Sequence, residues 1–297
     1  MNKAYLKYIL ALLLFGTNGI VANLIALSSY EIVFLRTMIG SLLLIVIFTL
    51  TKRKLSFFQK KQQLLSLAVS GIALGTSWIF LYEAYQQIGV SFASLAYYCG
   101  PVIVMVLTPI LFHERLTVTK GIGFLSVLVG IFLVNGQMAV SGANRWGVFC
   151  GAMSALLYAA MVIFNKKAKD ITGLENSMLQ LIFSFLTVAV YLVSKQGLNV
   201  HIEGSDVIPV LILGLLNTGV GCYLYFSSIG LLGVQTVAIC GYLEPLSAVV
   251  FSVLFLREGM SIIQLIGAVL ILGGAISGEL FELGNRRVSL KPQKNQI

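Results

Sequence analysis

Long apolar stretches, separated by short connectors along almost the whole chain, constrain the fold more than any other feature. Each is about 20 residues long and nearly free of charged side chains. An α-helix of ~20 residues spans the ~30 Å hydrocarbon core of a bilayer. Backbone N–H and C=O groups must be bonded internally in lipid, which restricts such segments to helices. The chain is therefore predicted to be an all-α polytopic membrane protein.

Composition supports this class and argues against a nucleic-acid partner. Only 10% of the 297 residues are charged and 58% are hydrophobic, whereas a soluble domain carries ~25% charged residues. The net charge of +9 would suggest nucleic acid in a soluble protein. In a membrane protein, the same excess is typical of lysines and arginines kept on the cytoplasmic face. The expected macromolecular surroundings are the lipid bilayer, with no nucleic acid.

Ten transmembrane spans are expected: 5–27, 31–51, 64–86, 91–112, 118–136, 146–165, 175–194, 207–229, 234–256 and 261–280. The first resembles a signal peptide, but its apolar run is too long and no small-x-small cleavage site follows, so we expect it to be retained. If the N-terminus is cytoplasmic, most of the 20 lysines and arginines also lie on the cytoplasmic side. The positive-inside rule then places both termini in the cytoplasm and the protein in the plasma or inner membrane.

The two halves of the chain are similar in sequence. Residues 89–131 align with 233–275 at a constant offset of 144 and without a gap. The matched pairs include Tyr98/Tyr242, Pro101/Pro245, Glu114/Glu258, Gly123/Gly267 and Gly130/Gly274. Five spans per copy is an odd number, so the second copy must enter the membrane from the opposite side. The chain is therefore expected to hold two inverted five-helix repeats, 1–136 and 146–280, followed by a basic cytoplasmic tail, 281–297.

This organisation resembles the EamA-like drug/metabolite transporter superfamily. The resemblance covers nearly the whole chain and includes a repeated signature, "GPVIVMVLTPILFHERL" and "EPLSAVVFSVLFLREGM". The second copy departs from the first only slightly, with Gly259-Met260 in place of Arg115-Leu116. The resemblance implies export or exchange of small metabolites, such as amino acids, by alternating access. It also implies a central cavity walled by the first, third, fourth, sixth, eighth and ninth helices.

Glu244 is the principal candidate for a functional group. It lies near the middle of the ninth span and is followed at once by Pro245, which loosens the helix by removing a hydrogen bond. Burial disfavours the charged form of a carboxyl group, and ionisable groups inside a membrane commonly serve transport. Glu244 would suit a proton or a cationic substrate. The structural alternative is that it stays protonated and hydrogen-bonds a neighbouring helix.

Further candidates for substrate contact are aromatic and amide side chains predicted to lie within the membrane: Trp78, Tyr82, Tyr98, Tyr158, Tyr242, Asn18 and Asn217. Aromatic faces can hold a cationic group, although aromatic residues also gather at membrane interfaces without any ligand. The two amides can equally join helices. Arg36, in the second span, can either extend its charge to the interface or bind an anionic group.

The inventory of polar residues argues against an enzyme. The two histidines, His113 and His201, lie at span ends or in loops, and the two aspartates lie in connectors. No HExxH, GxSxG, Walker or CxxC motif is present, and no metal or cofactor is expected. The sequence favours a secondary transporter of an amino acid or amine, with proton coupling as one option. A non-transporting sensor or scaffold and a channel are the alternatives, and a monomer is compatible with the pattern.

Overall fold

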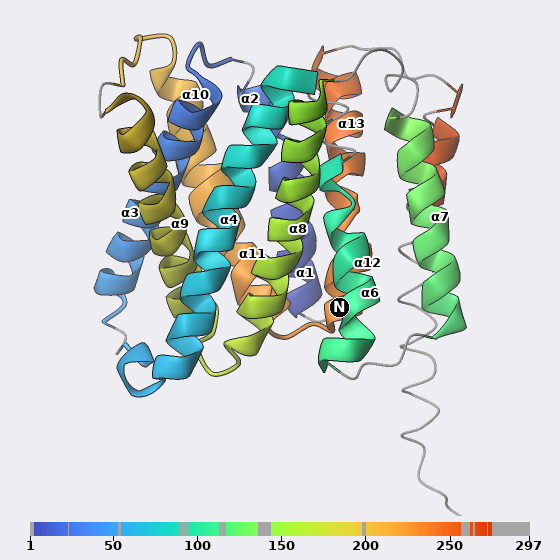
Figure 1. Cartoon of the computed structure of the whole chain (residues 1–297), viewed down its shortest axis with the longest axis horizontal. Helices are drawn as coiled ribbons and strands as arrows, with labels where there is room; N and C mark the ends of the chain where they lie inside the picture. Colours follow the sequence, from blue (N-terminus) through green and yellow to red (C-terminus); the bar gives the residue numbers. More distant parts are fainter. Residues whose placement is uncertain are drawn as a thin grey trace, which may run out of the picture.

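The computed structural model describes residues 3–22, 24–52, 55–88, 93, 96–112, 117–135, 144–197, 200–256, 262–263, 265–271 and 273–274. Over these residues the chain is a bundle of helices without strands (Figure 1). Six segments are long and apolar enough to cross a membrane: Lys3–Ala22, Ser29–Leu50, Lys61–Ile88, Arg145–Lys167, Gly173–Gln196 and Val207–Ile229. A multi-pass helical membrane protein is thus confirmed, whereas the count of ten spans stays a prediction.

The helices follow the order of the expected spans. They are α1 (Lys3–Gly16), α2 (Asn18–Ala22), α3 (Ser29–Leu50), α4 (Lys61–Ile88), α6 (Gly100–Phe112), α7 (Val118–Asn135), α8 (Arg145–Lys167), α9 (Gly173–Gln196), α10 (Val207–Leu211), the π-helix η3 (Ile212–Val220), α11 (Gly221–Ile229), α12 (Val234–Gly241) and α13 (Leu243–Leu256). A short 3-10 turn, η1 (Phe57–Gln59), precedes α4. The described residues of the expected last span, within 262–274, are also helical.

Several expected spans are divided. The first consists of α1 and α2, which meet at Thr17. The ninth is interrupted at Tyr242, and α6 likewise begins just after a turn at Tyr98 and Cys99. Pro245 is the third residue of α13 and Pro101 the second of α6. A proline is tolerated there because N–H groups in the first turn of a helix have no intrahelical partner.

The helix contacts between the two halves of the chain come in equivalent pairs. α4 packs against α8 and α9, while η3 packs against α1 and α3 and α11 packs against α1. Likewise, α6 packs against α8, and α13 packs against α1. Adding 144 to the residue numbers maps α4 onto the α10–α11 segment, α3 onto α9 and α6 onto α13. The sequence repeat is therefore also a repeat of packing partners.

A second set of contacts joins α7 to the helical residues near 270, at one side of the bundle in Figure 1. The hydroxyl of Ser126 donates a 3.0 Å hydrogen bond to the main-chain oxygen of Leu270. A Cβ atom added to Gly130 would lie 2.6 Å from the oxygen of Gly267, and one added to Gly274 would collide with the oxygen of Gly123. Glycine is required at these positions because the two backbones approach closely.

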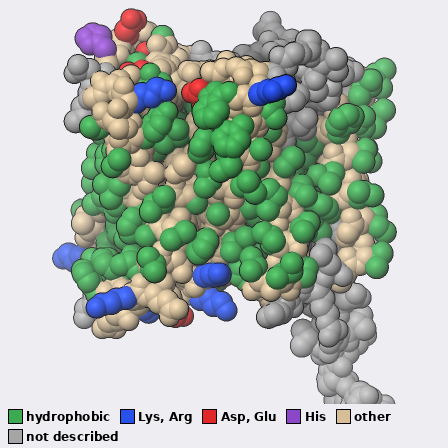
Figure 2. Space-filling model, in the orientation of Figure 1, with side chains coloured by type: hydrophobic (Ala, Val, Ile, Leu, Met, Phe, Trp, Pro, Cys, Tyr) green, Lys and Arg blue, Asp and Glu red, His purple; other side chains and the backbone are tan. Residues whose placement is uncertain are grey.

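The surface has an apolar middle and polar ends. Hydrophobic side chains cover the middle of the face in Figure 2, whereas charged side chains lie toward the two ends. Many large apolar residues of the described chain are exposed, including Leu125, Val190 and Ile208 at 64%, 72% and 69%. Such an apolar surface is stable against lipid rather than water.

Candidate functional site

A cavity of about 40 Å³ lies within the bundle, where five helices and the segment preceding α6 meet. Its lining residues come from the α1–α2 segment, α4, the turn before α6, α8, α11 and α13. They are Phe15, Asn18, Leu74, Trp78, Tyr97, Tyr158, Met161, Cys222, Tyr225, Phe226 and Glu244. These elements correspond to the first, third, fourth, sixth, eighth and ninth spans. A volume of this size holds a few water molecules, since each needs ~10–15 Å³.

Glu244 is the one acidic residue among these lining residues. It is the second residue of α13, so its carboxylate belongs to the first turn of a helix that begins inside the bundle. The helix dipole favours a negative charge at that end. Among the described residues no side chain or main-chain N–H donates a hydrogen bond to this carboxylate, whereas the Ser247 hydroxyl donates a 2.8 Å bond to the main-chain oxygen of Glu244. The carboxylate is thus available to a ligand or a proton.

Aromatic rings form much of the remaining wall. Tyr97 and Tyr158 meet edge to face with ring centroids 5.3 Å apart. The hydroxyls of Tyr158 and Tyr225 are 3.2 Å apart and share a hydrogen bond. Tyr8 packs against Tyr225 at 5.3 Å and donates a 2.7 Å hydrogen bond to the oxygen of Val237. These contacts connect α1, α8, α11 and α12, and Tyr97, Tyr158 and Tyr225 line the same cavity as Glu244.

The structure brings four of the eight candidate residues together. Glu244, Trp78, Asn18 and Tyr158 all line the central cavity. Asn217 lies behind Asn18: its side-chain amide donates to the oxygen of Leu14 at 2.9 Å, to Thr17 Oγ1 at 2.7 Å and to Asn18 Oδ1 at 3.0 Å. Asn217 therefore joins η3 to the break between α1 and α2, and its amide group is occupied by this link.

Tyr98 and Tyr242 lie apart from the cavity lining. The hydroxyl of Tyr242 donates a 3.0 Å hydrogen bond to the main-chain oxygen of Tyr98. Tyr242 is fully buried in a second apolar cluster with Val127, Leu246 and Ile271. The neighbouring Tyr97 lines the cavity instead. The sequence repeat identified Tyr98 and Tyr242, which link the two halves at the helix breaks. It did not identify Tyr97, which lines the cavity.

Tyr82 contacts Arg36, which does not reach the interface. Arg36 is only 2% exposed. Its Nη1 donates to the Tyr82 hydroxyl at 3.1 Å and its Nε to Thr218 Oγ1 at 2.9 Å. Its guanidinium carbon lies 4.5 Å from the centre of the Trp78 ring. The possibility that this side chain extends to the membrane surface is wrong, because its bonding partners all lie inside the bundle.

Sequence reasoning missed most of the apolar part of the lining. Phe15, Leu74, Tyr97, Met161, Cys222, Tyr225 and Phe226 were not candidates, yet all line the cavity. Helical spacing offers a partial signal, because Leu74 and Trp78 are four residues apart, as are Cys222 and Phe226, and such pairs share a helix face. Apolar spacing alone cannot separate a cavity wall from an ordinary helix contact.

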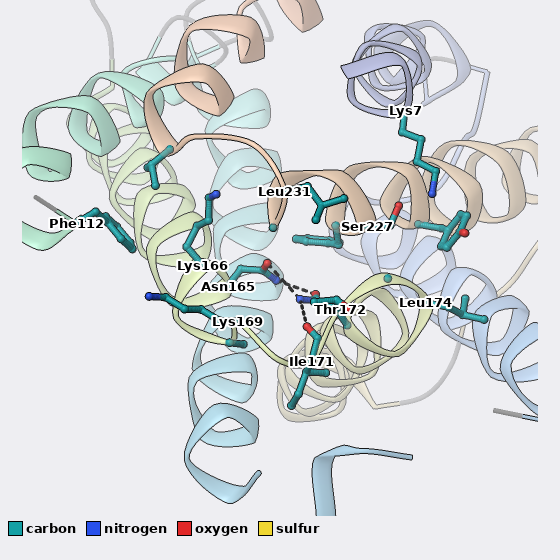
Figure 3. A pocket seen from close by; sticks show the side chains of 17 residues that line it. Lys7, Phe112, Asn165, Lys166, Lys169, Ile171, Thr172, Leu174, Ser227 and Leu231 are labelled. Carbon is teal, nitrogen blue, oxygen red and sulfur yellow. Dashed lines mark hydrogen bonds between the residues drawn. The ribbon is translucent and has the colours of Figure 1, made fainter. Parts of the chain in front are cut away.

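A second, larger cavity of about 640 Å³ lies at the end of the bundle that carries Lys7, Lys166 and Lys169 (Figure 3). Lys166 donates a hydrogen bond to the main-chain oxygen of Leu232, and the Lys7 ammonium lies 5.2 Å from the centre of the Tyr223 ring. Lys169 is exposed, so the cavity reaches the surface. Phe226 lines both cavities.

Among the described residues, no group of three or more His, Cys, Asp and Glu side chains could hold a metal ion. An apolar belt around a helical bundle, with an internal cavity lined by aromatic rings and one carboxylate, is the architecture of a multi-pass membrane protein. Sequence comparison gives the family. The family model of the EamA-like transporter family matches residues 2–136 and 145–277, and the chain belongs to this family.

Relatives of similar length carry transporter names. The chain is 23% identical over 276 residues to the uncharacterized transporter YxxF of Bacillus subtilis, covering 92% of this chain and 88% of the relative. It is also 23% identical over 302 residues to the uncharacterized inner membrane transporter YicL of Salmonella typhimurium, covering 96% and 97%. A solved crystal structure shares the fold with a TM-score of 0.81 at 20% identity, covering 94% of this chain and 98% of that one.

Proposed function

We propose that this chain is a secondary transporter that exports or exchanges a small amino acid or amine by alternating access. Glu244 is proposed to bind the ammonium group of the substrate or, in alternation with it, a proton. The observation that carries the proposal is the Glu244 carboxylate, which lines the central cavity and accepts no hydrogen bond within the described residues. Trp78, Tyr97 and Tyr158 line the same space and suit the cationic or apolar part of such a molecule.

The two cavities support alternating access. A space of about 640 Å³ falls in the range of small-molecule sites, whereas about 40 Å³ is too small for a metabolite. Phe226 is the lining residue that the two cavities share. We therefore assign this conformation to a state in which the Lys7 end admits solvent and the central site is closed. Movement of Phe226 and the helices beside it would join the two spaces.

The contacts between the halves support inverted repeats. Ser126 contacts Leu270, its own repeat mate, while Gly130 faces Gly267 and Gly274 faces Gly123. As the residue number rises in one segment, it falls in the other. That reciprocal pattern is expected when a pseudo-two-fold axis in the membrane plane relates two antiparallel helices. In transporters built from inverted repeats, the substrate site lies near the membrane midplane at the interface of the two repeats, so that each side of the membrane can reach it in turn.

We place both termini in the cytoplasm of a cell whose plasma or inner membrane holds the protein. Lys3, Lys52, Lys61 and Lys167 lie at the Lys7 end of the bundle, in keeping with the positive-inside rule. A cysteine introduced at Lys169 should react with a membrane-impermeant thiol reagent only in inside-out vesicles. One introduced at the exposed Glu203 should react in intact cells. The reverse pattern would invert the orientation.

The first experiment is a thermal-shift screen of purified wild type and Glu244→Gln against amino acids, amines, nucleosides and organic acids. The matched control is Glu203→Gln, an exposed carboxylate. A substrate should raise the Tm of the wild type and of Glu203→Gln but not that of Glu244→Gln. An equal response of all three proteins would make Glu244 structural.

Flux then decides whether the bound compound is transported. Proteoliposomes preloaded with the unlabelled compound should accumulate the radiolabelled compound by exchange, with saturation at high concentration. A pH gradient should drive net uptake by the wild type but not by Glu244→Gln if the carboxylate carries a proton. Flux without saturation would indicate a channel, and binding without flux would indicate a sensor.

A further inference from the structure

Arg36 is a buried cation close to the central cavity. It lies two turns inside α3 and is 2% exposed. A charged side chain at this depth is costly, and such residues in membrane proteins usually pair with an opposite charge or serve a substrate path. Within the described part of the chain, however, the atoms bonded to Arg36 are the neutral hydroxyls of Tyr82 and Thr218. No carboxylate of the described residues is in direct contact with the positive charge.

One end of the guanidinium is unoccupied. Arg36 Nη2 is buried and has no hydrogen-bond partner among the described residues, whereas Nε and Nη1 are bonded. Buried polar atoms are almost always satisfied, and a buried unsatisfied donor is costly. The bonds of Nε and Nη1 join α3 to η3 and α4. The free Nη2 has no structural use that the described residues show.

The position of Arg36 relates it to the proposed substrate. Its guanidinium lies 4.5 Å from the centre of the Trp78 ring, and Trp78 lines the central cavity. Glu244 lines the same cavity as Trp78. A carboxylate thus lines the cavity and a buried cation contacts the ring of another lining residue, without a direct ion pair between the two charges among the described residues.

We infer that Arg36 forms an anion subsite that binds the carboxylate of the substrate, while Glu244 binds its ammonium group, so that the substrate is a zwitterion of the amino-acid class. This inference rests on the proposed function, because it assumes that the cavity beside Glu244 is the transport site. A guanidinium forms strong, directional hydrogen bonds to carboxylates. The subsite favours amino acids over simple amines, which would leave Nη2 unsatisfied, and over simple organic acids, which would leave Glu244 unpaired.

The test uses ligands that differ by one charged group: phenylalanine, phenylethylamine and 3-phenylpropionate, with the leucine-derived series beside them. Binding is measured by thermal shift, and exchange is measured in proteoliposomes. The wild type should bind an amino acid more tightly than the matching amine or acid. Loss of hydrogen bonds to a charged group should make Arg36→Gln bind the amino acid about tenfold to a hundredfold more weakly. Its binding of the amine should not change.

Arg36→Lys keeps the positive charge but loses the planar guanidinium. It should also bind the amino acid more weakly than the wild type does, with its affinity for the amine unchanged. Arg145→Gln, at the exposed start of α8, is the matched control and should bind like the wild type. An equal loss for amino acid and amine in both Arg36 variants would make Arg36 purely structural. If those variants do not fold, the wild-type series decides: a preference for the amine or the acid over the amino acid overturns the inference.

The inference and the proposed function fail in different ways. Exchange of amines or organic acids without exchange of amino acids would leave a transporter and remove the anion subsite. Absence of any exchange by the wild type, across the whole screen, would remove the proposed function itself.

Discussion

The hydroxyl of Tyr242 donates a 3.0 Å hydrogen bond to the main-chain oxygen of Tyr98, 144 residues away. The two tyrosines occupy the same position in the two sequence repeats, and each lies at a helix break followed by a proline. The bond therefore joins the two halves at equivalent points. It also satisfies a main-chain oxygen that the broken helix leaves without its usual partner.

Tyr242→Phe should lower the free energy of unfolding, because it removes the hydroxyl donor and leaves the main-chain oxygen of Tyr98 without this hydrogen bond. The expected loss is about 1 kcal/mol, measured as a lower Tm in detergent. Tyr98→Phe is the matched control, since the bond uses the main-chain oxygen of Tyr98 and not its hydroxyl. Equal Tm values for the two variants would contradict the role given to Tyr242.

Gly130→Ala and Gly274→Ala should both destabilise the contact between α7 and the last helical segment. A methyl group at Gly130 would lie 2.6 Å from the main-chain oxygen of Gly267, and backbone cannot move aside as a flexible side chain can. Gly121→Ala, also in α7, meets nothing within 4 Å. It should be neutral or stabilising, because alanine is the better helix former by ~1 kcal/mol. Thermal unfolding of the three variants tests this, and a loss at Gly121 equal to that at Gly130 would refute it.

Substitution of Asn217 should mainly lower stability, whereas substitution of Asn18 should mainly weaken substrate binding. Asn217→Ala removes bonds to Leu14, Thr17 and Asn18, and interhelical hydrogen bonds in membranes contribute ~0.6–1.7 kcal/mol. Its Tm should fall. Asn18→Ala removes only one of those acceptors but also alters the cavity wall, so its Tm should fall less while its affinity for substrate falls more. A larger fall in Tm for Asn18→Ala, or a larger loss of substrate affinity for Asn217→Ala, would contradict these assignments.

Phe226→Ala should join the two cavities, because Phe226 is the lining residue that they share. The readout is alkylation of Cys222, which is 1% exposed and lines the central cavity, in a variant with the other three cysteines replaced. A reagent supplied from the Lys7 side should react several-fold faster than with Phe226 present.

Phe185→Ala, a truncation of a ring that packs against Phe34 at 5.6 Å, is the control. It should reduce stability without exposing Cys222. If both variants accelerate alkylation equally, general loosening rather than a gate explains the result.

The sequence by itself determined the class of fold, because each apolar stretch must form a helix to satisfy its backbone in lipid. It also identified the family, confirmed over both halves of the chain. Local chemistry was equally readable: a proline beside Glu244 predicted a weak point in the ninth span, and the helix there is divided at Tyr242. These properties depend on neighbours along the chain or on the match between the halves.

Only the tertiary structure decided which side chains share a space. Glu244, Trp78, Asn18 and Tyr158 lie on four different helical segments, yet they line one cavity. Arg36 was as compatible with the interface as with the interior until its partners on α4 and η3 were known. Each helix presents its side chains in every direction around its axis, and the sequence of one helix does not specify its rotation against five others. The packing of all the helices together fixes that rotation, and with it the site.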